Sequence, residues 1–90
     1  MSLTKRFSVK VPINIEKLIK KYPLFVQSKF REVLEKFELG ERVDIIKKQG
    51  SDSEYRIRIG RYRIVLIKTT ATEFYVSDID SRERIYWFLI

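Results

Sequence analysis

Arginine side chains alternate with apolar ones in the segment 55–67, whose sequence is YRIRIGRYRIVLI. Because successive side chains of a β-strand point to opposite faces, Arg56, Arg58 and Arg63 are expected on one face, with Ile and Tyr on the other. Two alternating runs separated by Gly60-Arg61 predict a tight hairpin with a type II′ turn, which sets Arg58 opposite Arg63. A planar guanidinium donates two parallel hydrogen bonds to a phosphate, so this cluster indicates an anion site.

The predicted Arg58–Arg63 pair has a simpler alternative explanation. Like charges directly opposite in a sheet destabilise it, within the roughly 0.2–1 kcal/mol range of cross-strand effects, which favours a bound anion that offsets the repulsion. The alternative is that these arginines are solvated on the exposed face of an ordinary sheet. A longer turn would shift the register and separate the pair.

The charge balance narrows the class of partner. The 90-residue chain has a formal net charge of +7, and six of its nine Arg lie between Arg56 and Arg84. A basic folded domain most often binds nucleic acid or an acidic protein, although a hyperthermophilic source also raises the Lys, Arg and Glu content.

The length predicts one domain over residues 1–90. The lack of cysteine fits a reducing cytoplasm, and no apolar run is long enough to span a bilayer.

Histidine and cysteine are both absent, which excludes several chemistries. The usual zinc sites need these residues, as do Ser-His-Asp and Cys-His nucleophile systems. Any acid–base chemistry must therefore come from carboxylates, Lys, Arg or Tyr. We expect neither a metal nor a cofactor.

The elements that position the arginines follow from hydrophobic periodicity. Residues 5–11 and 42–48 read as strands on their β-branched and alternating apolar residues, and 73–79 reads as a further strand. Two amphipathic helices are predicted between the first two of these strands. One extends to Tyr22 with Asn14 as its N-cap, and the other covers about 24–39 and ends before Gly40. The apolar tail IYWFLI, residues 85–90, is expected either to pack back on the domain or to cover a partner site.

These elements predict an α+β domain of order β-α-α-β-β-β. We expect a mostly antiparallel four-stranded sheet with the helical hairpin packed on one face. The helices should cover the Ile/Tyr face of the arginine hairpin and leave the Arg face to solvent or ligand.

Four pieces of the chain together resemble the RelE/ParE toxin superfamily. They are VDIIKKQG at 43–50, YRIRIGRYRIVLI at 55–67, the strand within 74–79, and SRERIY at 81–86, which is similar to a C-terminal Arg-x-x-(aliphatic)-Tyr ending. For a RelE-type member the resemblance implies a RelE-like fold and a toxin that enters the ribosomal A site and cuts mRNA. The implied reaction is metal-independent attack of a ribose 2′-OH on the adjacent phosphate.

The resemblance also implies roles for individual residues. Arg58 and Arg63 would clamp the phosphate, Arg82 would stabilise it or protonate the leaving oxygen, and Tyr86 would be the base. The unperturbed tyrosine pKa of about 10 would have to fall, and nearby Arg side chains favour this. Tyr86 also fits an aromatic core position. The residues expected to bind the RNA backbone are Lys47, Arg56, Arg61 and Arg84.

Two other functions remain compatible with the resemblance. One is a ParE-like toxin that inhibits DNA gyrase, which needs the fold but not the catalytic residues. The other is a catalytically inactive basic relative that binds RNA. Every toxin reading implies a cytoplasmic protein with a small cognate antitoxin as its partner, and the nuclease reading adds mRNA and the ribosome.

Overall fold

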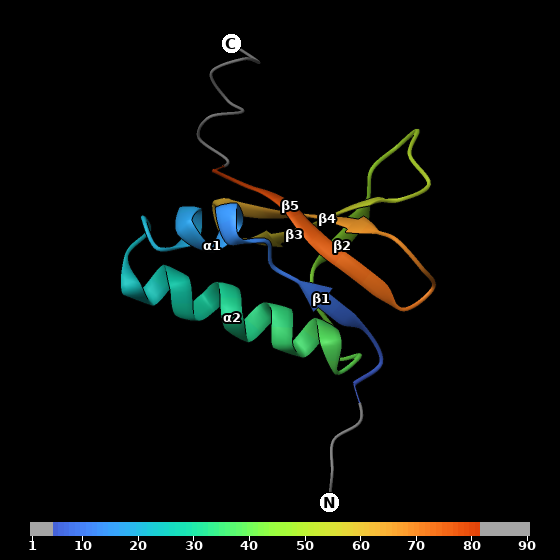
Figure 1. The fold of residues 1–90 in the computed structure, drawn as a ribbon, viewed down its shortest axis with the longest axis horizontal. Coiled ribbons are helices and arrows are strands. Elements are labelled where there is room, and N and C mark those ends of the chain that lie inside the picture. Colours follow the sequence, from blue (N-terminus) through green and yellow to red (C-terminus); the bar gives the residue numbers. More distant parts are fainter. Residues whose placement is uncertain (1–4, 82–90) are drawn as a thin grey trace, which may run out of the picture.

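The computed structural model describes residues 5–81, and all structural statements below concern this part of the chain. Two helices lie on one side of a sheet (Figure 1). None of the helices in this range is long and apolar enough to cross a membrane. The elements in chain order are β1 (Ser8–Lys10), α1 (Ile13–Ile19), α2 (Leu24–Glu38), β2 (Ile45–Lys47), β3 (Glu54–Ile59), β4 (Tyr62–Lys68) and β5 (Glu73–Ser81).

The strands form one five-stranded sheet in the order β1-β5-β4-β3-β2. Neighbouring strands are antiparallel except β1 and β5, which run parallel and are separated in the chain by both helices and the other three strands. The α+β class and the helices on one face are confirmed. The predicted count of four strands is wrong by one, because the order β-α-α-β-β-β gave the hairpin a single symbol although its two arms are separate strands.

The helix ends are set mainly by proline and glycine. Pro12 and Pro23 precede α1 and α2, where a fixed φ near −60° starts a helix and the missing N–H is not needed. The predicted N-cap at Asn14 is wrong, because Asn14 already lies inside α1 and no side chain caps that helix. Gly40 follows α2 with φ of +78°, as expected, and a Cβ there would collide with the side chain of Arg6.

The core lies between the helices and the hairpin. Ile57, Ile64 and Leu66 are fully buried, as the alternation predicted, and they pack with Phe30 of α2 and Val76 of β5. Burial of this apolar face is the main force that fixes the sheet register, since a one-residue slip would turn it to solvent. The opposite face of β3 and β4, which carries the arginines, is therefore the face that the helices leave uncovered.

Candidate functional site

The hairpin has the register that the sequence predicts. Ile59 pairs with Tyr62, and Arg58 pairs with Arg63. Gly60 has φ of +56°, whereas no residue other than glycine has a positive φ in the described chain. Positive φ at the first turn residue alone is the signature of a type II′ turn, so both the turn type and the arginine pair are confirmed.

Arg58 and Arg63 approach each other closely because of how β3 is hydrogen-bonded. The backbone N–H of Arg58 donates to the carbonyl oxygen of Asp44 at 2.9 Å, so it points toward β2 and away from β4. The pair is therefore of the non-hydrogen-bonded type, in which Cα atoms lie about 4.5 Å apart and side chains are closest. Arg58 and Arg63 are thus closest neighbours on the uncovered face through their backbones, and the Arg58 guanidinium is directed toward Asp44 on the β2 side.

Carboxylates flank this pair on both neighbouring strands. The Nη2 of Arg58 lies 3.2 Å from Oδ1 of Asp44, next to β2, and its Nε lies 3.4 Å from the same oxygen. On the other side, Asp80 of β5 is the cross-strand partner of Arg63. The row across the sheet reads Asp44, Arg58, Arg63, Asp80, with charges −, +, +, −. The carboxylates reduce the repulsion between the arginines and hold Arg58 in place.

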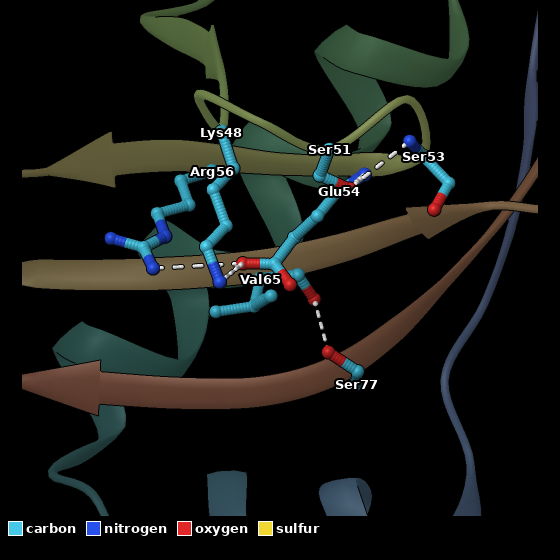
Figure 2. A network of polar contacts seen from close by, with 7 residues as sticks. All are labelled: Lys48, Ser51, Ser53, Glu54, Arg56, Val65 and Ser77. Atoms are coloured by element: carbon cyan, nitrogen blue, oxygen red, sulfur yellow. Dashed lines mark hydrogen bonds and ion pairs between the residues drawn. The ribbon is translucent and has the colours of Figure 1, made fainter.

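Arg56 is held by a second set of contacts two residues back along β3 (Figure 2). Its Nη2 lies 3.5 Å from Oε2 of Glu54, an oxygen that also lies 3.7 Å from Nζ of Lys48. Ser51 Oγ accepts hydrogen bonds from the backbone N–H groups of Ser53 at 3.3 Å and Glu54 at 3.1 Å, which fixes the turn before β3. The Nε of Arg56 is buried and has no hydrogen-bond partner within the described chain.

A shallow hollow of about 300 Å³ lies over β3, β4 and β5 on this face. Its lining residues are Glu54, Arg56, Arg63, Val65, Ser77, Asp78 and Asp80. Two guanidinium groups and three carboxylates therefore share it, which gives it a formal charge of −1. An anion that binds here must share the guanidinium donors with protein carboxylates. Between residues 5 and 81, no group of three or more acidic side chains is arranged to hold a metal ion.

A β-bulge brings two of these carboxylates to the hollow. The β4–β5 register shifts between Val65 and Leu66, whose partners are Asp78 and Val76, so Ser77 is the extra residue. Its Oγ donates to the carbonyl oxygen of Val65 at 3.5 Å (Figure 2). Beyond the bulge, Asp78 and Asp80 share the face of Arg63, while Ile79 returns to the core. Bulges commonly redirect side chains next to functional sites.

The predicted site residues do not all come together. Arg56, Arg58 and Arg63 share the uncovered face. Lys47 is the cross-strand partner of Tyr55, so it projects to the helix side, where its Nζ lies 4.0 Å from Oδ1 of Asp52. Arg61 lies in the hairpin turn at the end of the sheet. The remaining predicted residues, Arg82, Arg84 and Tyr86, lie outside the described range.

Asp44, Glu54, Asp78 and Asp80 were not singled out from the sequence. The sequence does carry a weak signal for Asp44, Asp78 and Asp80. In RVDII and in SDID the acids alternate with apolar residues, as they do on the solvent face of a strand. Which strands lie beside the hairpin depends on long-range pairing, so the sequence did not indicate that these acids flank the arginines.

Comparison with known proteins identifies the family. No protein-family model matches the chain. A curated archaeal protein, toxin RelE1 of Methanocaldococcus jannaschii, is 33% identical over 63 residues, which cover 66% of this chain and 70% of that protein.

Two solved structures share the fold. One is the RelB–RelE antitoxin–toxin complex from Methanococcus jannaschii, with a TM-score of 0.70 at 22% identity over 90% of this chain and 99% of the other. The second is the archaeal RelE–RelB complex from Pyrococcus horikoshii OT3, with a TM-score of 0.71 at 23% identity over 88% and 98% of the two chains. At this identity the two structures support the fold, and the sequence match to RelE1 supports the family. The chain belongs to the RelE toxin family.

Proposed function

We propose that this protein is the toxin of a toxin–antitoxin system and that it cleaves mRNA in the ribosomal A site. One observation carries the proposal beyond family membership: Arg58 and Arg63 stand side by side on the face that the helices leave uncovered. An in-line phosphoryl transfer spreads negative charge over the non-bridging oxygens, and fixed cations aimed at those oxygens lower its barrier. Guanidinium groups carried by two paired strand residues can supply such donors without a metal.

The proposed reaction is a transesterification within the RNA. The 2′-oxygen of one ribose bonds to the adjacent phosphorus, the bond from phosphorus to the 5′-oxygen breaks, and a 2′,3′-cyclic phosphate results. The proton of the 2′-OH goes to a base, for which we propose Tyr86, and the departing 5′-oxygen takes a proton from an acid. Arg82 donates this proton or stabilises the phosphate, together with Arg58 and Arg63.

The remaining basic residues are proposed to hold the RNA backbone. Arg56, next to Arg58 on the same face, contacts the neighbouring phosphate. Arg61 and Arg84 contact the strand beyond the hairpin turn. Lys47 projects to the other side of the sheet, so it contacts a different segment of RNA.

The proposed protein partner is an antitoxin. Both similar structures are complexes of a RelE toxin with its RelB antitoxin. A chain of this family with a net charge of +7 fits a partner that carries complementary acidic groups.

The carboxylates on the arginine face favour a second candidate. Glu54, Asp78 and Asp80 bring the hollow to a formal charge of −1, which weakens long-range attraction of RNA to this part of the sheet. A ParE-like toxin that inhibits gyrase needs no phosphate site there. A catalytically inactive relative that only binds RNA needs a weaker one.

Translation of a defined message by purified ribosomes separates these candidates. The nuclease proposal expects cuts at fixed positions within codons that depend on the ribosome, and loss of these cuts in Arg82→Ala and Tyr86→Phe variants. An intact message together with gyrase-linked DNA breaks would support the gyrase inhibitor instead. Retained RNA binding with neither effect would support the inactive relative.

A further inference from the structure

An apolar hollow lies between the start of α2 and the hairpin turn. It has a volume of about 250 Å³ and is separate from the arginine face. Its lining residues are Phe25, Val26, Lys29, Ile59, Gly60, Arg61 and Tyr62. Phe25 is 70% exposed and its neighbour Leu24 is 79% exposed, although both are large apolar residues at the start of a helix. Exposed apolar side chains that gather beside a hollow mark a surface that another segment covers.

The chain itself leads to this hollow. β5 ends at Ser81, which is the cross-strand partner of Tyr62, and Tyr62 lines the hollow. Only Arg82, Glu83 and Arg84 separate Ser81 from the six consecutive apolar residues 85–90, IYWFLI. An extended residue spans about 3.3 Å, so a connection of this length covers about 10 Å or more. That is enough to pass from the end of β5 to the neighbouring hollow.

We propose that the C-terminal segment 85–90 of this same chain docks in the hollow and covers Phe25. The docked segment exchanges two water-exposed apolar surfaces for one buried contact, which the hydrophobic effect favours. The lining is apolar on both sides, from Phe25 and Val26 of α2 and from Ile59 and Tyr62 of the hairpin. The charged connection 82–84 remains at the rim.

Docking bears on the cleavage reaction, and this consequence rests on the proposed function. Asp80 is the partner of Arg63 and β5 ends at Ser81, so β5 ends at the side of the sheet where the arginine pair lies. A segment anchored through residues 85–90 keeps Arg82 near that end, whereas Tyr86 belongs to the docked segment and lies with it in the hollow, away from the arginine face. The contact with Phe25 then acts as a positioning element for Arg82, while docking and the proposed role of Tyr86 as the base exclude each other at any one time.

Tryptophan fluorescence tests the docking directly, because Trp87 is the single tryptophan of the chain and lies in the proposed segment. We expect emission typical of an apolar environment in the full chain. Phe25→Asp should shift the emission to the red and raise acrylamide quenching severalfold. The matched control is Ile13→Asp, since Ile13 is 73% exposed on α1 and does not line the hollow. Circular dichroism checks that both variants fold.

Disulfide trapping provides a second measurement, since the chain has no cysteine of its own. Phe25→Cys is combined in turn with a cysteine at Ile85, Phe88 or Ile90, and Ile13→Cys replaces Phe25→Cys in the controls. At least one Phe25 pair should cross-link within a single chain under mild oxidation, because a disulfide needs Cα atoms about 4.4–6.8 Å apart. None of the control pairs should do so.

Three outcomes would overturn the proposal. They are solvent-like Trp87 emission in the unmodified chain, emission that Phe25→Asp leaves unchanged, and cross-links that form only between chains. An emission shift that disappears on dilution would assign the hollow to a second copy of the chain. Neither measurement uses RNA, so failure of the nuclease proposal would not affect the docking proposal. If docking fails, the proposed chemistry at Arg58 and Arg63 is still tested separately by the cleavage assay.

Discussion

Arg58 and Asp44 are joined through both backbone and side chain. The N–H of Arg58 donates to the carbonyl oxygen of Asp44 at 2.9 Å, and its Nη2 lies 3.2 Å from the carboxylate. Both side chains are about half exposed, at 51% and 55%. Solvent therefore screens the ion pair, and its main effect is to hold Arg58 and to oppose other anions, with little gain in stability.

Asp44→Asn should strengthen the binding of single-stranded RNA. The substitution removes the negative charge that is ion-paired with Arg58. The affinity for an incoming phosphate should rise by a factor of about two to five at low salt. Fluorescence anisotropy with a labelled oligonucleotide measures this. Glu32→Gln is the control, because it also removes a carboxylate that is ion-paired with a cation, Lys36, but on α2. Equal gains in both variants would mean that only net charge matters.

Glu54→Gln should destabilise the protein more than Asp44→Asn does. The Glu54 side chain is only 22% exposed and forms ion pairs with both Arg56 and Lys48. The amide would leave two cations without their shared carboxylate, at a cost of about 1 kcal/mol in the free energy of unfolding, whereas the exposed pair should account for less than about 0.5 kcal/mol. Urea denaturation measures both. A larger loss of stability in Asp44→Asn than in Glu54→Gln would show that the contacts of Glu54 do not support β3.

Gly60→Ala should damage the arginine site through the backbone alone. Gly60 has φ of +56° and a Cβ would meet nothing within 4 Å, so the penalty is conformational, about 1–2 kcal/mol. Gly50→Ala is a matched control, since Gly50 has φ of +83° and is equally open, but lies in the turn before β3. Both variants should lose similar stability in urea. Cleavage of message should fall further in Gly60→Ala, because the turn sets the Arg58–Arg63 register.

The hairpin could be predicted because its determinants are local. Alternation assigns the faces, and a two-residue turn that begins with glycine fixes the register, so the Arg58–Arg63 pair followed from thirteen residues of sequence. The helix stripes and the end of α2 before Gly40 followed in the same way. The N-cap of α1 was mispredicted at Asn14 because Asn is a favourable capping residue. In the structure Pro12, two residues earlier, occupies the N-cap position.

The environment of the arginines could not be predicted, because it depends on which strands become neighbours. Asp44 contacts Arg58 beside the β2–β3 pair, and Asp80 is the cross-strand partner of Arg63 in the β4–β5 pair. The bulge at Ser77 was visible in the core spacing, since Phe74 and Val76 are two residues apart but Ile79 follows three residues later. That break in alternation shows a bulge only once the strand is known to extend to Ser81.

Single-turnover cleavage of ribosome-bound message by Arg58→Ala, Arg63→Ala and the double variant tests the central claim most directly. If the two guanidinium groups hold one phosphate, each single change should slow cleavage about 100-fold, and the double change should cost less than the product of the two. Loss of folding is not expected to interfere, because removing one arginine relieves repulsion of up to about 1 kcal/mol. Arg31→Ala, exposed on α2, should cleave within about twofold of the unmodified chain. Cleavage by the double variant at the unmodified rate would contradict the account.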